Sequence, residues 1–205
     1  KLASFLFSYF AADSAEFGQV FNNDSLRQSL GFTKETFIGM FIPNTYELYW
    51  TATPEDILKR MYNEYKRFWN KERCDKAKNI GLTIPQVMTL ASIVNEETKN
   101  IEEMPTIASV YMNRLKKGML LQADPTVVYA NLDSEPNIRR VLKKHLKVDS
   151  PYNTYKHKGL PPGPITIPDI KAIEAVLNYE KSNYLYFCAK AELDGTHNFA
   201  STYSQ

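Results

Sequence analysis

Cysteine, net charge and long apolar runs are all scarce in this sequence of 205 residues. Cys74 and Cys188 lack the close spacing of zinc sites and redox motifs, so we expect two free thiols, with a single disulfide as the alternative. The formal net charge of +2 does not indicate nucleic-acid binding, which needs a clear basic excess. No apolar stretch is long enough to span a bilayer.

The composition is that of a folded chain. An apolar fraction of 43% and a charged fraction of 23% allow a packed core and argue against disorder. The length suits one domain of ordinary size, or one domain plus a fragment of another. The sequence begins at Lys1 rather than at Met, so we expect that a preceding signal or membrane anchor is missing from it.

The spacing of apolar residues and turn signals predicts an α+β fold. Helices are expected at these places: two or three short ones within residues 1–38, one capped at Asp24-Ser25, and others from Pro54, over Ile84–Thr98, over 106–116 and from Pro168. Residues 184–189 are expected to form a buried strand. Asp194-Gly195 then predicts a turn, and residues 197–200 a returning strand. The Gly-Leu-Pro-Pro-Gly-Pro run at 159–164 predicts a rigid loop.

A basic run extends from Arg139 to Lys147. We favour its interpretation as the solvated face of a short helix. The alternative is a surface that meets an anionic polymer or lipid headgroups.

The helix expected over Ile84–Thr98 separates two adjacent glutamates. Its buried face is marked by apolar residues at helical spacing, which are Val87, Leu90, Ala91 and Val94. Glu97 follows three residues after Val94 and therefore flanks this face, whereas Glu96 points into water.

A half-buried carboxyl group such as that of Glu97 has two interpretations. Arginine or backbone donors satisfy it, or desolvation raises its pKa so that it stays protonated near neutral pH and acts as a general acid. Spacing alone favours the first interpretation.

Two polar segments shift this balance. Residues 122–126 carry an amide, a carboxylate and a hydroxyl group next to a proline, and residues 152–155 add two aromatic rings, an amide and a hydroxyl group. Rings that stack and side chains that hydrogen-bond to neutral hydroxyl groups suit a sugar polymer. Each segment alone is typical of a well-capped loop, but both together around Glu97 favour a sugar-binding site.

Several long motifs occur in a specific order from about residue 39 to the end. They are FIPNTY at 41–46, LASIVNEET at 90–98, ASVYMNRL at 108–115, LQADPTVVY at 121–129, YNTY at 152–155, GLPPGPI at 159–165, YLYF at 184–187 and GTHNF at 195–199. Together they resemble the YceG-like endolytic murein transglycosylases, also called the MltG family.

The resemblance implies an organisation and an activity. Residues 1–38 are expected to be the C-terminal part of a LysM-like accessory subdomain, and residues 39–205 a mixed helical and small-sheet YceG-like catalytic domain. A bacterial protein is implied, held in the cytoplasmic (inner) membrane by one N-terminal helix, with its catalytic domain on the extracytoplasmic or periplasmic side. The implied reaction cuts bonds between N-acetylmuramic acid and N-acetylglucosamine within nascent glycan strands and leaves 1,6-anhydro ends.

The resemblance also implies site residues. The family's helix usually reads Glu-Lys-Glu-Thr, and the first two positions here are Asn95 and Glu96, so only Glu97 matches a family acid. Glu97 is therefore the expected catalytic acid and base. The residues expected to position sugar and stabilise developing charge are Gln122, Asp124, Thr126, Asn153 and Tyr155. No metal or other cofactor is expected.

Some positions have two interpretations or depart from the family. Asn44 and Ile38 replace family acids that we interpret as structural. Asp124 either contacts substrate or is buried and holds its loop. His197 either reaches the site or has a structural role, and we favour the second. The rings expected in the core rather than on a sugar platform are those of Tyr184, Tyr186 and Phe187.

Three alternative functions stay open at this point. The first is a peptidoglycan-binding module without catalysis. The second is a muramidase that uses water and needs a second acid, for which Asp124 is the obvious candidate. The third is a scaffold for cell-wall synthases, which is compatible with catalysis. Peptidoglycan strands are the expected partner in each case, and nucleic acid is not expected.

Overall fold

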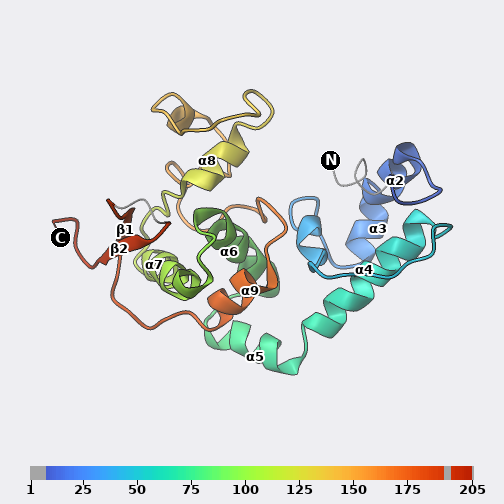
Figure 1. Ribbon diagram of the computed structural model, residues 1–205, viewed down its shortest axis with the longest axis horizontal. Coiled ribbons are helices and arrows are strands. Elements are labelled where there is room, and N and C mark those ends of the chain that lie inside the picture. The colour runs from blue at the N-terminus through green and yellow to red at the C-terminus, as the bar shows by residue number, and fades with distance from the viewer. Residues whose placement is uncertain (1–7, 192–194, 205) are drawn as a thin grey trace.

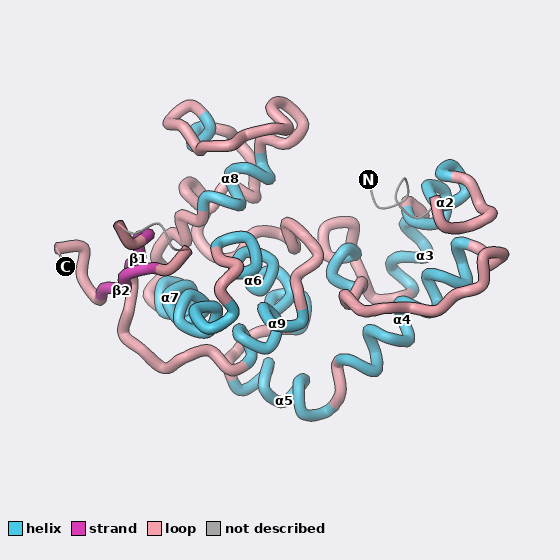
Figure 2. Tube along the Cα trace, in the orientation of Figure 1, coloured by secondary structure: helices cyan, strands magenta, loops and turns pink. Residues whose placement is uncertain are grey.

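The computed structural model describes residues 8–191 and 195–204. This part of the chain is mixed helical with a single two-stranded sheet, which confirms the expected α+β class (Figure 2). No helix within it is both long and apolar enough to cross a membrane. Its elements are α2 (Ser14–Phe21), α3 (Asp24–Ser29), η1 (Phe37–Met40), α4 (Pro54–Phe68), α5 (Lys71–Asn79), α6 (Ile84–Glu97), η2 (Ile101–Glu103), α7 (Met104–Lys116), α8 (Asp124–Ala130), η3 (His145–Lys147), α9 (Ile170–Leu177), β1 (Tyr186–Ala189) and β2 (His197–Ala200).

Local caps set the ends of the two central helices. At the start of α6, Thr83 Oγ1 accepts from the backbone N–H of Gln86, and the Gln86 side chain accepts from the backbone N–H of Thr83. This reciprocal pair satisfies two N–H groups that a helix start leaves without partners. After α7, Gly118 takes a φ of +63°, a conformation that favours glycine and ends the helix.

The core consists of two clusters of buried side chains. The larger one lies where α6 packs against α7 and α9. The smaller one is rich in phenylalanine and joins α2, η1 and α4. Figure 1 shows α2, α3 and α4 on one side of the molecule and α6, α7 and α9 on the other. The smaller cluster reaches Met61 of α4, and the domain boundary after residue 38 stays a prediction.

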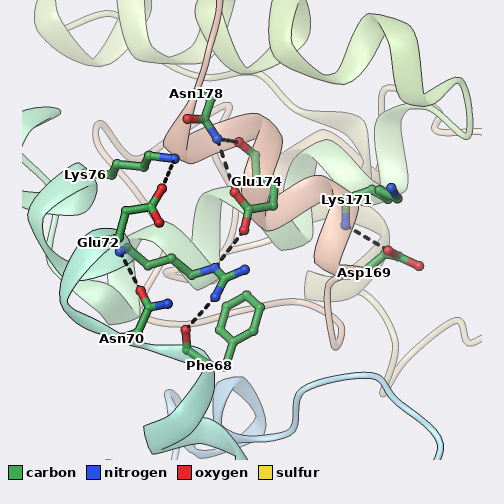
Figure 3. Close-up of polar contacts among 9 residues, drawn as sticks. Phe68, Asn70, Glu72, Lys76, Asp169, Lys171, Glu174 and Asn178 are labelled. Carbon is green, nitrogen blue, oxygen red and sulfur yellow. Dashed lines mark hydrogen bonds and ion pairs between the residues drawn. The ribbon is translucent and has the colours of Figure 1, made fainter.

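A side-chain contact ties α5 to α9. Arg73 Nε donates to Glu174 Oε1 at 2.7 Å, and its Nη1 donates to the carbonyl of Phe68 at 3.0 Å. The same guanidinium lies over the Phe68 ring, 4.2 Å from its centroid. Figure 3 shows this group of contacts, in which Glu174 also accepts from Asn178. The contacts join α5 and the end of α4 to α9, which is part of the larger core.

The proline-rich loop at 159–165 packs between the N-terminal segment and α6. A Cβ atom at Gly163 would lie 2.1 Å from the carbonyl oxygen of Glu35, so only glycine fits there. Two residues later, the N–H of Ile165 donates to Ser92 Oγ of α6 at 3.0 Å. The loop therefore has the rigid role that its sequence predicts.

Two predicted local structures are wrong, one near the N-terminus and one that carries Asp124. The cap of α3 is Asn23 rather than Asp24-Ser25, because the Asn23 side chain accepts from the N–H of Leu26. Residues 124–126 of the segment interpreted as a loop form the start of helix α8. Pro125 fits the first turn of a helix, because the N–H that proline lacks would have no partner there. Asp124 fits the same turn, because the helix dipole favours a negative charge at the N-terminus.

The basic run also differs from its prediction. Residues 139–144 form no helix, and only a short 3-10 turn follows at His145–Lys147. The buried ring of His145 explains this, since its Nδ1 accepts from the N–H of Leu142 at 2.9 Å and takes a donor that a helix would use.

The two strands pair antiparallel, with Phe187 opposite Phe199. The predicted first strand is two residues too long, because β1 begins at Tyr186. It is also not buried, since Cys188 and Ala189 are exposed. A sheet of two strands that packs one face on α7 leaves the other face to solvent. The turn predicted at Asp194 lies outside the described residues. Both cysteines are free, as expected.

Candidate active site

Glu97 is the last residue of α6, and it keeps only a small exposed fraction, whereas Glu96 beside it is exposed. The separation predicted from helical spacing is therefore confirmed. Glu96 lies 3.6 Å from Lys99 Nζ in an ion pair at the surface.

The surroundings of Glu97 bring the pKa of its carboxyl group close to neutrality. Burial raises the pKa of Glu97 from its ordinary value of 4.5 to about 7. A hydrogen bond from Tyr111 Oη to Glu97 Oε1, 2.5 Å long, acts in the opposite direction and lowers this pKa. The charge of Asp124 raises the pKa further, while His197 and Arg114 lower it. A pKa near neutrality lets one group donate a proton and then accept another.

Tyr111 and Arg114 lie one turn apart on α7, and sequence reasoning gave neither a role. Both are buried. Arg114 Nε donates to the carbonyl of Leu185 at 2.7 Å, and its Nη1 donates to that of Leu121 at 2.5 Å. A tyrosine and an arginine three residues apart on the same face of an apolar helix were the available signal.

Two hollows meet at Glu97. The larger is a cleft of about 640 Å³, and the smaller has a volume of about 270 Å³. Glu97 and Asp124 line both of them. Tyr129, Arg139 and Arg140 also line the larger cleft.

Asp124, Tyr155 and Gln122 lie at the surface of the site. Asp124 is exposed at the start of α8, and its Oδ1 accepts from Tyr155 Oη at 2.5 Å. Burial raises the pKa of Tyr155, and Asp124 raises it further. Gln122 is exposed, lines the smaller hollow and has a φ of +52°, which is rare for a residue other than glycine. The structure therefore brings these three predicted residues together with Glu97.

Thr126 and Asn153 lie behind this surface. Both are fully buried. Thr126 Oγ1 lies 2.8 Å from the hydroxyl oxygen of Thr154, and the Asn153 amide donates to the carbonyls of Leu146 and Val148. Their polar groups are used within the protein, so in this structure they hold the segments that carry Asp124 and Tyr155 and do not face the hollows.

His197 combines the two roles that its sequence position allowed. Its Nδ1 and its backbone N–H both bond to the Glu103 carboxylate, each at 2.9 Å. Its ring also lines the smaller hollow and packs edge-on against Phe187. Phe187 in turn packs at 90° to the Tyr111 ring, and it is partly buried and also lines the smaller hollow, so it is not purely a core ring. The half-buried ring of Tyr186 lies under Arg114.

Comparisons with known proteins agree on one family. The endolytic murein transglycosylase of Bacillus subtilis (strain 168) is 39% identical over 177 residues, which are 86% of this chain and 47% of that protein. The enzyme of the same name from Streptococcus pneumoniae (serotype 2, strain D39) is 35% identical over 154 residues, 74% of this chain and 28% of that protein. This chain thus spans less than half the length of either relative.

The fold has a close counterpart in a crystal structure of a YceG-like protein from Listeria monocytogenes. The two superpose with a TM-score of 0.84 at 32% sequence identity, over 99% of this chain and 70% of that one. The model of the YceG-like family matches residues 8–205, nearly the whole chain. The chain therefore belongs to the YceG-like family.

Proposed function

We propose that this chain carries the catalytic site of an endolytic lytic transglycosylase of peptidoglycan, with Glu97 as its one proton-transfer residue. The observation that carries this proposal is the position of Glu97, a buried carboxyl group with a pKa of about 7 where two hollows meet. The names of the relatives from B. subtilis and S. pneumoniae support the proposal, since both are called endolytic murein transglycosylases.

The reaction needs one carboxyl group and no water. Protonated Glu97 donates its proton to the glycosidic oxygen between N-acetylmuramic acid and N-acetylglucosamine. The bond from the anomeric carbon to that oxygen breaks, and the glucosamine side leaves with a new hydroxyl group. The Glu97 carboxylate then removes the proton from the 6-hydroxyl group of the muramic acid, and this oxygen bonds to the anomeric carbon. The product is a 1,6-anhydro end, and Glu97 is protonated again.

The surroundings of Glu97 fit both halves of this cycle. Burial favours the protonated carboxyl group that donates first. The hydrogen bond from Tyr111 favours the carboxylate that accepts second. Asp124 adds a negative charge beside the site, which favours the positive charge that develops on the sugar as the bond breaks.

Cleavage inside a strand requires sugar on both sides of the cut. The two hollows that share Glu97 and Asp124 offer room for sugar beyond the residue that is cut. Gln122 and Tyr155 border the smaller hollow, where a side-chain amide and a ring can contact sugar hydroxyl groups and faces.

One observation favours a second candidate, a muramidase that uses water. Asp124 is exposed, lines the same hollows and stands close enough to raise the pKa of Glu97, as a second acid of a hydrolase would. Cleavage in oxygen-18 water separates the two candidates. A transglycosylase gives anhydro ends without the label, and a muramidase gives reducing ends that carry it. A binding module gives no new ends.

The setting of the whole protein is also part of the proposal. We assign residues 1–38 to a LysM-like subdomain. Its helix α2 belongs to the phenylalanine-rich cluster, which is distinct from the larger core and continues beyond residue 38 into α4. A membrane anchor N-terminal to this sequence would hold the catalytic part on the extracytoplasmic side, next to newly made strands and the synthases that make them. Attachment of the full-length protein to membranes, and accessibility of its catalytic part to an external protease in spheroplasts, test this placement.

A further inference from the structure

The larger cleft is lined by two arginines that the proposed reaction does not use. Arg139 and Arg140 both line this cleft, which also contains Glu97 and Asp124. Both arginines are exposed. Among residues 8–191 and 195–204, neither has a hydrogen-bond or ion-pair partner.

Three other basic groups of this region, in contrast, have acidic partners. Lys144 Nζ lies 2.8 Å from Glu135 Oε2, and the same oxygen lies 3.2 Å from His145 Nε2. Lys156 lies 3.5 Å from Asp149. The unpaired positive charge that faces the cleft is therefore concentrated at Arg139 and Arg140.

The lining of the cleft thus carries both acidic and basic groups. Asp124 and Glu96 are its exposed acids, with Glu96 paired to Lys99, and the two arginines are its exposed basic groups. Charges arranged in this way orient a bound molecule that is itself charged at one end. Guanidinium groups bind carboxylates particularly well, because their paired N–H donors match the two carboxylate oxygens.

The proposed substrate carries such groups in one place. Both sugars of the strand are N-acetylated and neutral, and the lactyl group of each muramic acid is bonded to a stem peptide as an amide. The free carboxylates of the polymer are therefore on the stem peptides. We propose that Arg139 and Arg140 form a subsite for the stem-peptide carboxylates of a muramic acid bound in the larger cleft. This inference rests on the proposed function and names a further part of its substrate.

The subsite predicts a preference for strands that carry acidic peptides. A binding experiment tests this preference. All proteins in the experiment carry Glu97→Gln, so that the strands are bound but not cut. The ligands are soluble, uncross-linked strands with intact stem peptides, and the same strands after their peptide carboxylates have been converted to amides. Fluorescence anisotropy gives the Kd for each. The protein with both arginines should bind the acidic strands about tenfold more tightly, as expected for two exposed arginine–carboxylate pairs.

Two variants show whether the arginines cause this preference. Arg139→Gln with Arg140→Gln should remove the preference and leave the Kd for amidated strands unchanged. Lys143→Gln removes one exposed charge from the same segment outside the cleft and should keep the preference. Added salt should reduce the preference in the parent protein, because exposed ion pairs are screened. Thermal melting checks that the variants are folded.

The inference is overturned if the parent does not prefer acidic strands, or if the double variant prefers them equally. It is also overturned if the double variant loses only binding to phosphatidylglycerol vesicles, since the arginines then face a lipid surface. Failure of the proposed function is seen in a different experiment. The protein that retains Glu97 would then produce no anhydro ends from glycan strands, whatever the binding results.

Discussion

Tyr111 of α7 donates a hydrogen bond of 2.5 Å to the carboxylate of Glu97 at the end of α6. The Tyr111 ring is buried between its own helix and Phe187 of β1, so this hydroxyl group has a fixed position. The bond stabilises the charged form of Glu97 and opposes the effect of burial on its pKa. Tyr111 is thus a positioning and tuning residue for the proposed acid and base.

Replacing Tyr111 by Phe should raise the pKa of Glu97, because the carboxylate loses a donor and the burial remains. The alkaline limb of the pH dependence of kcat/KM on glycan strands should therefore move to higher pH. Tyr62→Phe, a half-buried tyrosine on α4, is the matched control and should leave the profile unchanged. An unshifted profile for the Tyr111 variant would show that the bond does not tune Glu97.

Glu97 should make the protein less stable at alkaline pH. Its folded pKa of about 7 lies above the ordinary 4.5 of an unfolded chain, so the folded state binds the proton more tightly. The contribution of Glu97 to stability therefore falls as pH rises from about 4.5 through 7. Glu97→Gln does not titrate, so it should gain stability relative to the parent by about 3 kcal/mol at pH 8 and little at pH 4.5.

Urea unfolding of both proteins across this pH range measures the difference directly. Titrations of all other groups are common to the two proteins and cancel in the comparison. A stability difference that stays constant from pH 4.5 to pH 8 would mean that the carboxyl group of Glu97 is solvated in the folded state.

Asp124→Asn should shift the pH profile in the opposite direction to Tyr111→Phe. The negative charge of Asp124 raises the pKa of Glu97, so its removal lowers that pKa and moves the alkaline limb to lower pH. Anhydro products should persist. Asp133→Asn changes an exposed acid after α8 and serves as the control. Loss of nearly all cleavage with Asp124→Asn alone would instead support the water-using muramidase.

Thr126→Val should destabilise the protein rather than weaken substrate binding. The hydroxyl group of Thr126 is buried and bonds to the Ala123 carbonyl and to Thr154, so its loss should cost about 1–2 kcal/mol. Thr45→Val, at an exposed threonine, should change stability by less than about 0.5 kcal/mol. Urea unfolding and the KM for strands check this. A raised KM with unchanged stability would place Thr126 in contact with sugar.

Helical periodicity was sufficient to predict the separation of Glu96 from Glu97. The spacing of Glu97 from Val94 depends only on the geometry of α6, so the half-buried position follows from the sequence around it. The start of α6 is likewise set locally, because its capping box is formed by Thr83 and Gln86, three residues apart.

The sequence could not predict relationships that depend on packing between distant elements. The contact from Tyr111 to Glu97 exists only because α6 and α7 pack together, and nothing in either helix alone specifies it. Arg139 lies in the cleft because its segment is not the expected helix. The buried His145 ring holds that segment in its irregular conformation. The burial of Thr126 follows from the unexpected helix α8.

Mass spectrometry of the products from purified glycan strands tests the central claim most directly, with the parent protein and Glu97→Gln compared side by side. The account predicts internal cuts that end in 1,6-anhydromuramic acid with the parent, and none with the variant, while the variant remains folded and still binds strands. Reducing ends from the parent, or anhydro ends from Glu97→Gln at a comparable rate, would contradict it.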